Sequence, residues 1–288
     1  MPLQVRLYSS VLAGVSDEDA LGSTDPMVQL AAHKLHYKIQ LGLTKGETEE
    51  DLRAFGKELD SGVCHVGAIW GLEYGWLQQE FPRLEPLIVL LQQETRFVSQ
   101  FLVRSKDHLG GEFATLKGKR LALYRGIPLM DRAYLAGLLH EGETVNTYFK
   151  VEKDQRYETV VEAINAVCDE EADCVLVNIE VYSHQLVNRP GLRKQLRAIV
   201  PSEPFPPAAL IGRRERLNQI RPRLWEDLQE TLEAMDQSAE GKECRRFWRV
   251  ERFARPEHAN LDFQAAVQKS LGIYPVTLLR KLPQVAPP

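Results

Sequence analysis

Apolar and polar positions alternate between strand-like and helical spacing along the first part of the chain. Residues 4–10 and 37–43 read as strands, residues 47–59 as a helix and residues 63–69 as a third strand. Val28, Ala31, Ala32 and Leu35 repeat at the helical interval, and Thr24 followed by Pro26 predicts that this helix begins there. The βαβαβ order favours a parallel sheet with helices on its faces.

The same alternation resumes further along the chain. We expect a helix over residues 72–79, an apolar stretch over 84–91, and strands over 96–103, 118–124, 145–150 and 174–177. Helices are expected over 128–139 and 157–167. Two more strands follow at 197–200 and 208–211, and a long amphipathic helix is expected over 217–235, with helices and loops beyond it.

These elements predict an α/β protein of two lobes. The final segment has apolar helical stripes but too few strands to form a core alone, so we expect it to pack on the first unit. The predicted lobes are residues 1–98 plus 202–288, which form a discontinuous lobe I, and residues 99–201, which form lobe II. Two strands would cross between them, near residues 97–101 and 200–207, and paired crossings of this kind make a hinge beside a cleft.

Composition narrows the function classes. The chain has 288 residues, 36 Lys and Arg against 40 Asp and Glu, and a net charge of −4, so nucleic acid is not expected as a partner. No run of eighteen apolar residues predicts a membrane span. The first residues lack an export-signal pattern, which indicates a cytoplasmic protein, or a periplasmic one if a signal has been removed. Cys168 and Cys174 are spaced for a local disulfide, with free buried thiols as the alternative.

Four segments carry a resemblance to a known family. Residues 115–123 (TLKGKRLAL), 60–68 (DSGVCHVGA), 171–177 (EADCVLV) and 199–207 (IVPSEPFPP) resemble, in order and spacing, motifs of substrate-binding proteins of ABC importers. The last segment is similar to the return crossing of the phosphate and phosphonate-binding branch. The resemblance covers residues 3–235. It implies a type II periplasmic-binding fold, a ligand held in the cleft and an ABC permease as partner.

One segment departs from the family pattern. After the GK motif, the phosphonate-binding branch has a turn rich in serine and threonine that holds the oxyanion, whereas residues 124–131 here read YRGIPLMD. Pro128 removes an N–H group and Asp131 brings a negative charge, so the sequence weakens the case for an anion at this helix N-terminus. Arg125 either compensates with a bidentate guanidinium or is a surface arginine.

Candidate ligand-binding residues follow from the rule that ligands meet the carboxyl ends of parallel strands. The rule selects polar or aromatic residues after each predicted strand and at the crossing, namely Tyr8, Ser9, Ser10, Trp70, Tyr74, Thr95, Arg125, Asn178 and Glu180. Such groups suit a small-molecule cleft. For each of them ordinary packing is the alternative, and Trp70 and Tyr74 could be core residues.

The sequence offers little to suggest catalysis. It contains no nucleophile elbow, phosphate-binding loop or dinucleotide fingerprint, and His33 and His36 lack a further ligand at metal spacing. We therefore expect no catalytic residue, metal or cofactor. The leading hypothesis is a monomeric solute-binding protein that captures a small polar or anionic ligand, of the phosphonate or phosphate class, for an ABC importer. The alternatives are an enzyme or a ligand sensor on the same fold.

Overall fold

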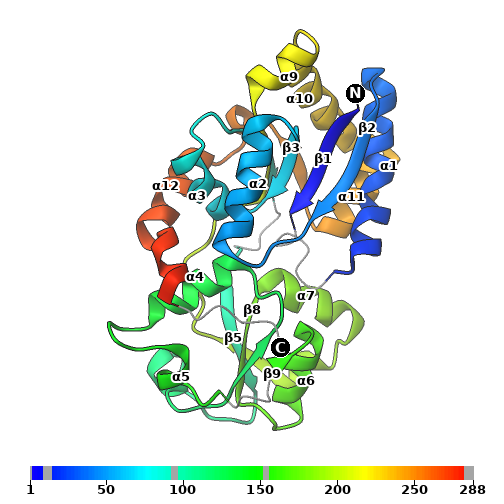
Figure 1. The fold of residues 1–288 in the computed structure, drawn as a ribbon. Helices are drawn as coiled ribbons and strands as arrows, with labels where there is room; N and C mark the ends of the chain where they lie inside the picture. The colour runs from blue at the N-terminus through cyan, green and yellow to red at the C-terminus, as the bar shows by residue number, and fades with distance from the viewer. Residues whose placement is uncertain (1, 9–14, 92–96, 152–155, 282–288) are drawn as a thin grey trace. The chain divides into compact units, whose positions relative to one another are not determined.

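The computed structural model describes residues 2–8, 15–91, 97–151 and 156–281, which fold into two compact units (Figure 1). Unit 1 comprises Met1–Arg96 and Phe205–Gly272, and unit 2 comprises Phe97–Pro204 and Ile273–Pro288. The chain therefore passes from one unit to the other three times. Each unit is built around its own sheet, and each is described here by itself.

Unit 1 contains a six-stranded sheet. Its strands, in spatial order, are β11 (Arg252–Ala254), β4 (Glu85–Leu91), β10 (Ala209–Gly212), β3 (Val66–Ile69), β1 (Leu3–Tyr8) and β2 (Ile39–Thr44). The three strands β1, β2 and β3 run parallel, as the βαβαβ pattern predicts. The sheet as a whole is mixed, because β10 enters from the return crossing and lies antiparallel to both β3 and β4, and β11 is also antiparallel to β4.

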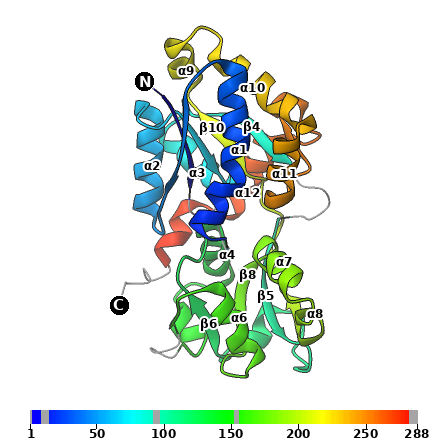
Figure 2. The same cartoon turned by 90° about the vertical axis from the view of Figure 1, so that its right-hand side faces the viewer.

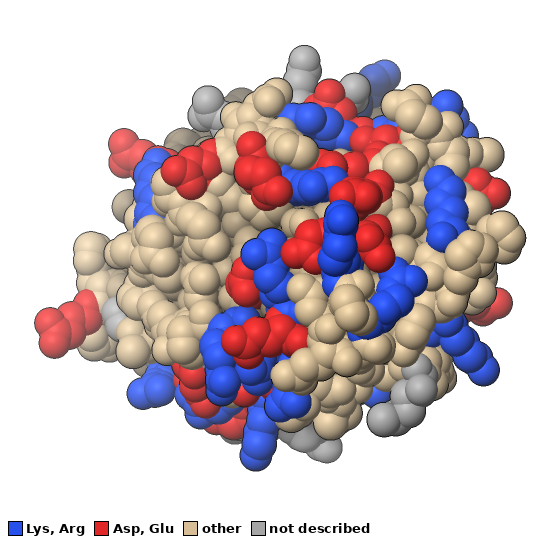
Figure 3. Space-filling model, turned by 90° about the horizontal axis from the view of Figure 1, so that it is seen from above, with Lys and Arg blue, Asp and Glu red and all other residues tan. Residues whose placement is uncertain are grey.

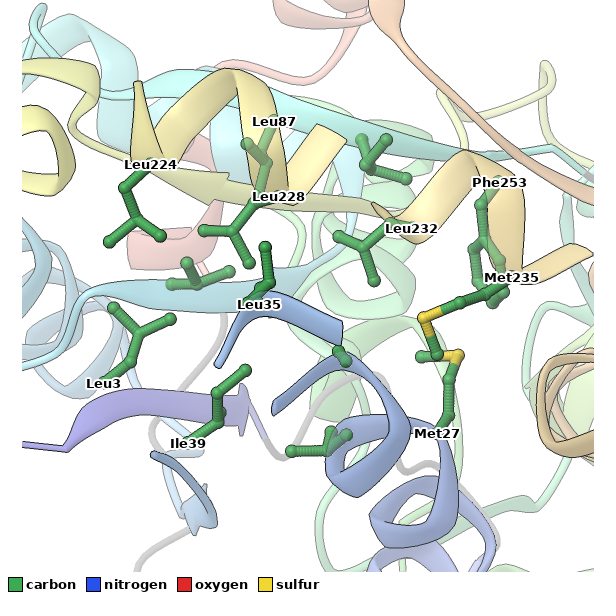
Figure 4. Packing of buried hydrophobic residues seen from close by; sticks show 14 of the residues in the cluster. Leu3, Met27, Leu35, Ile39, Leu87, Leu224, Leu228, Leu232, Met235 and Phe253 are labelled. Carbon is green, nitrogen blue, oxygen red and sulfur yellow. The ribbon is translucent and has the colours of Figure 1, made fainter. Parts of the chain in front are cut away.

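Helices cover both faces of this sheet (Figures 1 and 2). The helices of unit 1 are α1 (Asp17–Leu35), α2 (Glu49–Ser61), α3 (Gly71–Glu80), α9 (Arg214–Ile220), α10 (Leu224–Ala234), α11 (Ala239–Trp248) and most of α12 (Phe263–Ile273). Figure 4 shows how α1 and α10 interdigitate over the sheet, with Met27 and Leu35 of α1 beside Leu228 and Leu232 of α10. This apolar layer joins the beginning of the chain to residues more than 190 positions later.

Helix α1 begins earlier than the sequence predicts. Ser16 is its N-cap and accepts a hydrogen bond from the Asp19 N–H group at 3.1 Å, so Pro26 lies inside the helix. The expected cap, Thr24, is buried, and its hydroxyl accepts a hydrogen bond from the indole Nε1 of Trp248 at 2.9 Å. The prediction was wrong because a distant tryptophan on α11 uses the hydroxyl that the local pattern assigned to capping.

The long helix expected over residues 217–235 is two helices. Pro222 lies between α9 and α10, and its missing N–H group and its ring prevent a continuous helix. Arg223 follows with a φ of 64° and becomes the N-cap of α10. The short strand β11 was also not anticipated, since its three residues are too few to show an alternating pattern.

Unit 2 contains a five-stranded sheet. Its strands, in spatial order, are β7 (Arg156–Tyr157), β6 (Leu121–Tyr124), β8 (Cys174–Asn178), β5 (Ser99–Arg104) and β9 (Leu196–Ile199). Strand β6 is parallel to β7 and β8, whereas β5 is antiparallel to both β8 and β9. Phe101 on β5 is the centre of an aromatic cluster, with ring centroids 5.9 Å from Phe113, 6.0 Å from Phe149 and 6.4 Å from Tyr134.

The α-helices in the described part of unit 2 lie beside its sheet. They are α4 (Leu129–Leu138), α5 (Val145–Tyr148), α6 (Val160–Cys168), α7 (Ile179–Asn188) and α8 (Leu192–Gln195). The strand expected over residues 145–150 is the helical turn α5. Thr144 and Thr147 form a capping box, in which each hydroxyl accepts a hydrogen bond from the other residue's N–H group. This local bonding competes with strand pairing, and only Lys150 makes a bridge, to Arg120.

The C-terminal segment belongs to unit 2. The lobes predicted from sequence placed all of residues 202–288 in the first body, but Tyr274 packs edge-to-face on Tyr134 of α4, with centroids 6.4 Å apart. The 3-10 helix η5 (Val276–Lys281) follows and also contacts α4. The assignment was wrong for this segment because the aromatic contact lies 140 residues away in sequence.

The surface of the molecule carries both signs of charge. Around α9 and α10, Arg214 pairs with Glu226, Arg221 with Asp227 and Arg223 with Glu230, and Figure 3 shows acidic and basic side chains interspersed on that face. All four cysteines, including Cys168 and Cys174, are free thiols. Among the helices in the described ranges, none is both long enough and apolar enough to cross a membrane.

Candidate ligand-binding site

Unit 1 presents two of the candidate residues at one edge of its sheet. Tyr8 ends β1 and Trp70 directly follows β3, and because these strands are parallel neighbours both residues lie at the same carboxyl edge. Both side chains are buried. The Tyr8 ring stacks on Phe55 with centroids 5.1 Å apart, and its hydroxyl has no hydrogen-bond partner among the residues that the structure describes. Burial raises the pKa of Tyr8 far above its ordinary value, so this edge carries a neutral phenol.

Tyr74 lies in the interior of unit 1. Its hydroxyl donates to the Leu84 carbonyl at 3.3 Å and accepts hydrogen bonds from Gln78 and Gln264 at 2.7 and 3.1 Å. Its ring stacks on Phe263 of α12, and burial raises its pKa to about 12. The phenol thus uses its one donor and both acceptor positions within unit 1, which agrees with the alternative that Tyr74 is a core residue.

Unit 2 gathers polar side chains at the carboxyl edge of its parallel strands. Tyr124 ends β6 and Asn178 ends β8, and the antiparallel strand β5 begins at the same edge with Ser99, which is paired with Asn178. Asp131, in the first turn of α4, completes the group. All four side chains are buried, at 4 % exposure for Tyr124 and 0 % for the other three.

The Asp131 carboxylate connects this group. The Ser99 hydroxyl donates to its Oδ1, and the Asn178 Nδ2 donates to its Oδ2 at 3.4 Å. Asn178 in turn caps α7, since its Oδ1 accepts the Val181 N–H group at 2.9 Å. Burial raises the pKa of Asp131 to about 7, although both hydrogen bonds oppose that shift. The carboxylate that the sequence analysis expected to bring a negative charge is thus an internal group, whose burial favours the protonated form.

The N-terminus of α4 has no side-chain cap. Pro128 is its N-cap and makes no side-chain capping hydrogen bond, so the N–H groups of the first turn, at residues 129–131, have no side-chain cap. As the N-cap, Pro128 leaves those donors in place and lacks only the N–H group of the N-cap position itself. Arg125 is 57 % exposed and lies 3.7 Å from Glu158. This exposure agrees with the alternative that Arg125 is a surface arginine. The residue nevertheless lies in the loop that leads into α4.

The remaining candidates are placed as follows. Glu180 is half-buried in the first turn of α7. Ser9, Ser10 and Thr95 lie outside the described residues. No group of three His, Cys, Asp or Glu side chains within the described ranges could hold a metal ion.

Ser99 was missed by the sequence analysis. The rule of carboxyl ends considers only parallel strands, whereas β5 is antiparallel and contributes its first residue to the same edge. A serine at the beginning of the crossing strand was the only local signal. Tyr124 and Asp131 lie in the segment that departs from the family pattern. The sequence comparison there concerned the missing serine and threonine residues, and it did not predict that Tyr124 and Asp131 are buried together.

The two α/β units, each with polar groups at the carboxyl edge of its sheet, define a class of protein. This is the fold of type II periplasmic binding proteins, as the structural comparisons show. PhnD1 from Prochlorococcus marinus, in complex with methylphosphonate, matches with a TM-score of 0.66 at 15 % identity, over 94 % of this chain and 96 % of that one. A Xanthomonas citri protein bound to ATP also matches with a TM-score of 0.66, at 16 % identity over 96 % and 98 % of the chains.

A third solved structure is a binding-protein component of an ABC phosphonate transporter from Pseudomonas aeruginosa, with a TM-score of 0.64 at 14 % identity over 97 % of both chains. No curated protein sequence matches the chain significantly. The family model described as "ABC transporter, phosphonate, periplasmic substrate-binding protein" matches residues 16–261. The chain therefore belongs to the family of periplasmic phosphonate-binding proteins of ABC transporters, which confirms the resemblance and the fold class predicted from the sequence.

Proposed function

We propose that this protein binds a small oxyanion of the phosphonate class and delivers it to an ABC permease. The observation that carries the proposal is the family match over residues 16–261. The geometry of unit 2 supports it, because an α4 N-terminus without a side-chain cap lies at the edge where Ser99 and Asn178 are fixed. Helix N-terminal N–H groups and hydroxyl donors suit a phosphonate oxygen.

We infer that side chains at the carboxyl edges of both units contact the ligand. In unit 1 these are Tyr8 and Trp70, and in unit 2 they include Arg125, Asn178 and Glu180. Aromatic walls with few polar groups fit a small ligand, and the Tyr8 hydroxyl, without a described partner, is a group that a ligand oxygen would satisfy. The family is periplasmic, so we propose an extracytoplasmic location, and we propose that the protein acts as a monomer.

Isothermal titration calorimetry and thermal unfolding with methylphosphonate, phosphate, methylsulfonate and ATP test the proposal. We expect methylphosphonate to bind and to raise the melting temperature, since a ligand that binds only the folded state stabilises it. The ligand should be recovered unchanged by mass spectrometry, whereas conversion would favour an enzyme. Failure of all four probes to stabilise the protein would contradict the proposal.

Substitution of Asn178 separates ligand binding from helix capping. Asn178→Asp keeps an N-cap acceptor for the Val181 N–H group but adds a carboxylate beside Asp131, so the affinity for methylphosphonate should fall at least about tenfold, or about 1.4 kcal/mol. Asn188→Asp, at the exposed far end of α7, is the matched control and should bind as the unsubstituted protein does. If the two variants bound methylphosphonate with equal affinity, Asn178 would not be a ligand-binding residue.

A further inference from the structure

The segments by which the chain enters and leaves unit 2 are joined near α4. Ser99 lies just after the entry at Phe97, and Ser202 lies just before the exit at Pro204. The Ser202 N–H group donates to the Ser99 carbonyl at 2.8 Å, and the Ser99 N–H group donates to the Ser202 hydroxyl oxygen at 3.0 Å. Ser99 and the exit segment are therefore hydrogen-bonded to each other in both directions.

Helix α4 holds the exit segment at a second point. One turn after Asp131, the Tyr134 hydroxyl donates to the Val200 carbonyl at 2.5 Å. Val200 has a φ of 50°, a left-handed conformation that is costly for a β-branched residue. The same tyrosine ring contacts Tyr274. One helix thus carries the candidate anion site at its N-terminus and bonds to the crossing segments along its length.

The surroundings of Asp131 contain hydrogen-bonding groups and no cationic partner among the described residues. It faces Ser99 of β5, the Tyr124 phenol of β6 and Asn178 at the end of β8. The charged groups of the adjoining elements lie nearer to solvent, with Arg125 paired to Glu158 in the loop before α4. Glu180 is half-buried in the first turn of α7.

The two hydrogen bonds of Asp131 decide where a proton can reside. When ionised, the carboxylate accepts from both Ser99 and Asn178. The Asn178 Nδ2 group can only donate, and the Oδ1 of that residue is committed to the Val181 N–H group. A proton on Oδ1 of Asp131 faces Ser99, whose hydroxyl oxygen can accept it. The Ser99 oxygen then becomes the acceptor, and its own O–H group is released to donate elsewhere.

We propose that Asp131 is a positioning residue that couples anion binding to proton uptake, because its protonation frees the Ser99 hydroxyl to donate to the ligand. The inference rests on the proposed function and deepens it. The proton comes from solvent and resides on Oδ1, and no other bond is made or broken. A bound anion also disfavours the ionised carboxylate. Because burial raises the pKa of Asp131 to about 7, affinity rises as the pH falls through neutrality.

Calorimetry with methylphosphonate from about pH 6 to about pH 8, in buffers of different ionisation enthalpy, measures the coupling. Asp131→Asn mimics the protonated acid, since its amide nitrogen can donate to Ser99 and its oxygen can accept from Asn178. We expect this variant to bind about tenfold more tightly than the unsubstituted protein at pH 8, with less proton uptake. The ligand's own titration is common to both proteins and cancels in the comparison.

Asp169→Asn is the matched control, because Asp169 is an exposed carboxylate at the end of α6, and it should retain the original pH profile. Ser99→Ala should bind weakly at acidic pH and lose the pH dependence assigned to Asp131. Proton uptake by Asp131→Asn equal to that of the unsubstituted protein would overturn the inference.

A second measurement needs no ligand. The 13C shift of the Asp131 carboxyl group, followed through its titration, should show a higher midpoint in Ser99→Ala, because the donor that stabilises the ionised form is lost. An unchanged midpoint would overturn the inference even if the protein binds methylphosphonate. Absence of methylphosphonate binding together with a raised midpoint would contradict the proposed ligand and leave the link between Asp131 and Ser99 supported.

Discussion

Gly71, the first residue of α3, lies where the return segment packs against the edge of unit 1. A Cβ atom at this position would lie 2.5 Å from the Cβ of Pro206 and 2.6 Å from the carbonyl oxygen of Pro207. We expect Gly71→Ala to lower the free energy of unfolding by about 1–3 kcal/mol, because backbone atoms must move to relieve the overlap. Urea denaturation measures this change.

Gly272→Ala is the matched control for that substitution. Gly272 lies in α12, and a Cβ atom there would meet no described heavy atom within 4 Å beyond its own turn of helix. Alanine should raise the free energy of unfolding by about 0.5–1 kcal/mol at this position, because glycine loses more conformational freedom in a helix. If both variants changed stability equally, close packing of the return segment would not be the reason for a glycine at position 71.

At the residue scale, a simple rule identified part of the candidate site. The carboxyl ends of parallel strands led to Asn178 and Trp70 because strand order along the chain is visible in the hydrophobic pattern. The rule could not find Ser99, whose place depends on an antiparallel pairing with Asn178 across 79 residues. Nor could it show that Asp131 is buried, since a carboxylate in a helical first turn is more often exposed.

At the element scale, the start of α1 can be tested by substituting the two competing caps. Ser16→Ala should cost about 1 kcal/mol in the free energy of unfolding, because it removes the acceptor for the Asp19 N–H group. Thr24→Ser keeps a hydroxyl for the Trp248 indole and should cost less. Thermal and urea unfolding followed by circular dichroism measure both. An unchanged free energy of unfolding in Ser16→Ala would mean that Ser16 is not the effective cap.

Two prolines show why element boundaries were only partly predictable. Pro222 ends α9 and separates it from α10, as its missing N–H group dictates. Pro26 lies inside α1, where the packing of Met27, Val28 and Ala31 on the core outweighs the lost hydrogen bond. The same residue type breaks one helix and is tolerated in another, because the decisive contacts are tertiary in the second case.

At the scale of the whole molecule, Tyr274 fixes the last described segment to unit 2. Tyr274→Ala removes the edge-to-face contact with Tyr134 and should cost about 2–4 kcal/mol, with faster amide exchange in η5. Tyr274→Phe keeps the ring and should cost much less. Hydrogen exchange with mass spectrometry compares the variants, and unchanged exchange in Tyr274→Ala would mean that other contacts hold η5.

The sequence by itself determined the α/β class, most of the strands and helices, and the family, because these follow from local periodicity and from motifs in a fixed order. Tertiary structure decided the antiparallel pairing of β5 with β8 and of β10 with β3. It also decided the cap of α1, the unit to which Tyr274 belongs and the burial of Asp131. Each of these depends on contacts between residues far apart in the chain. Such contacts stabilise the fold, but they do not change the hydrophobic periodicity of either segment, so the sequence pattern does not reveal them.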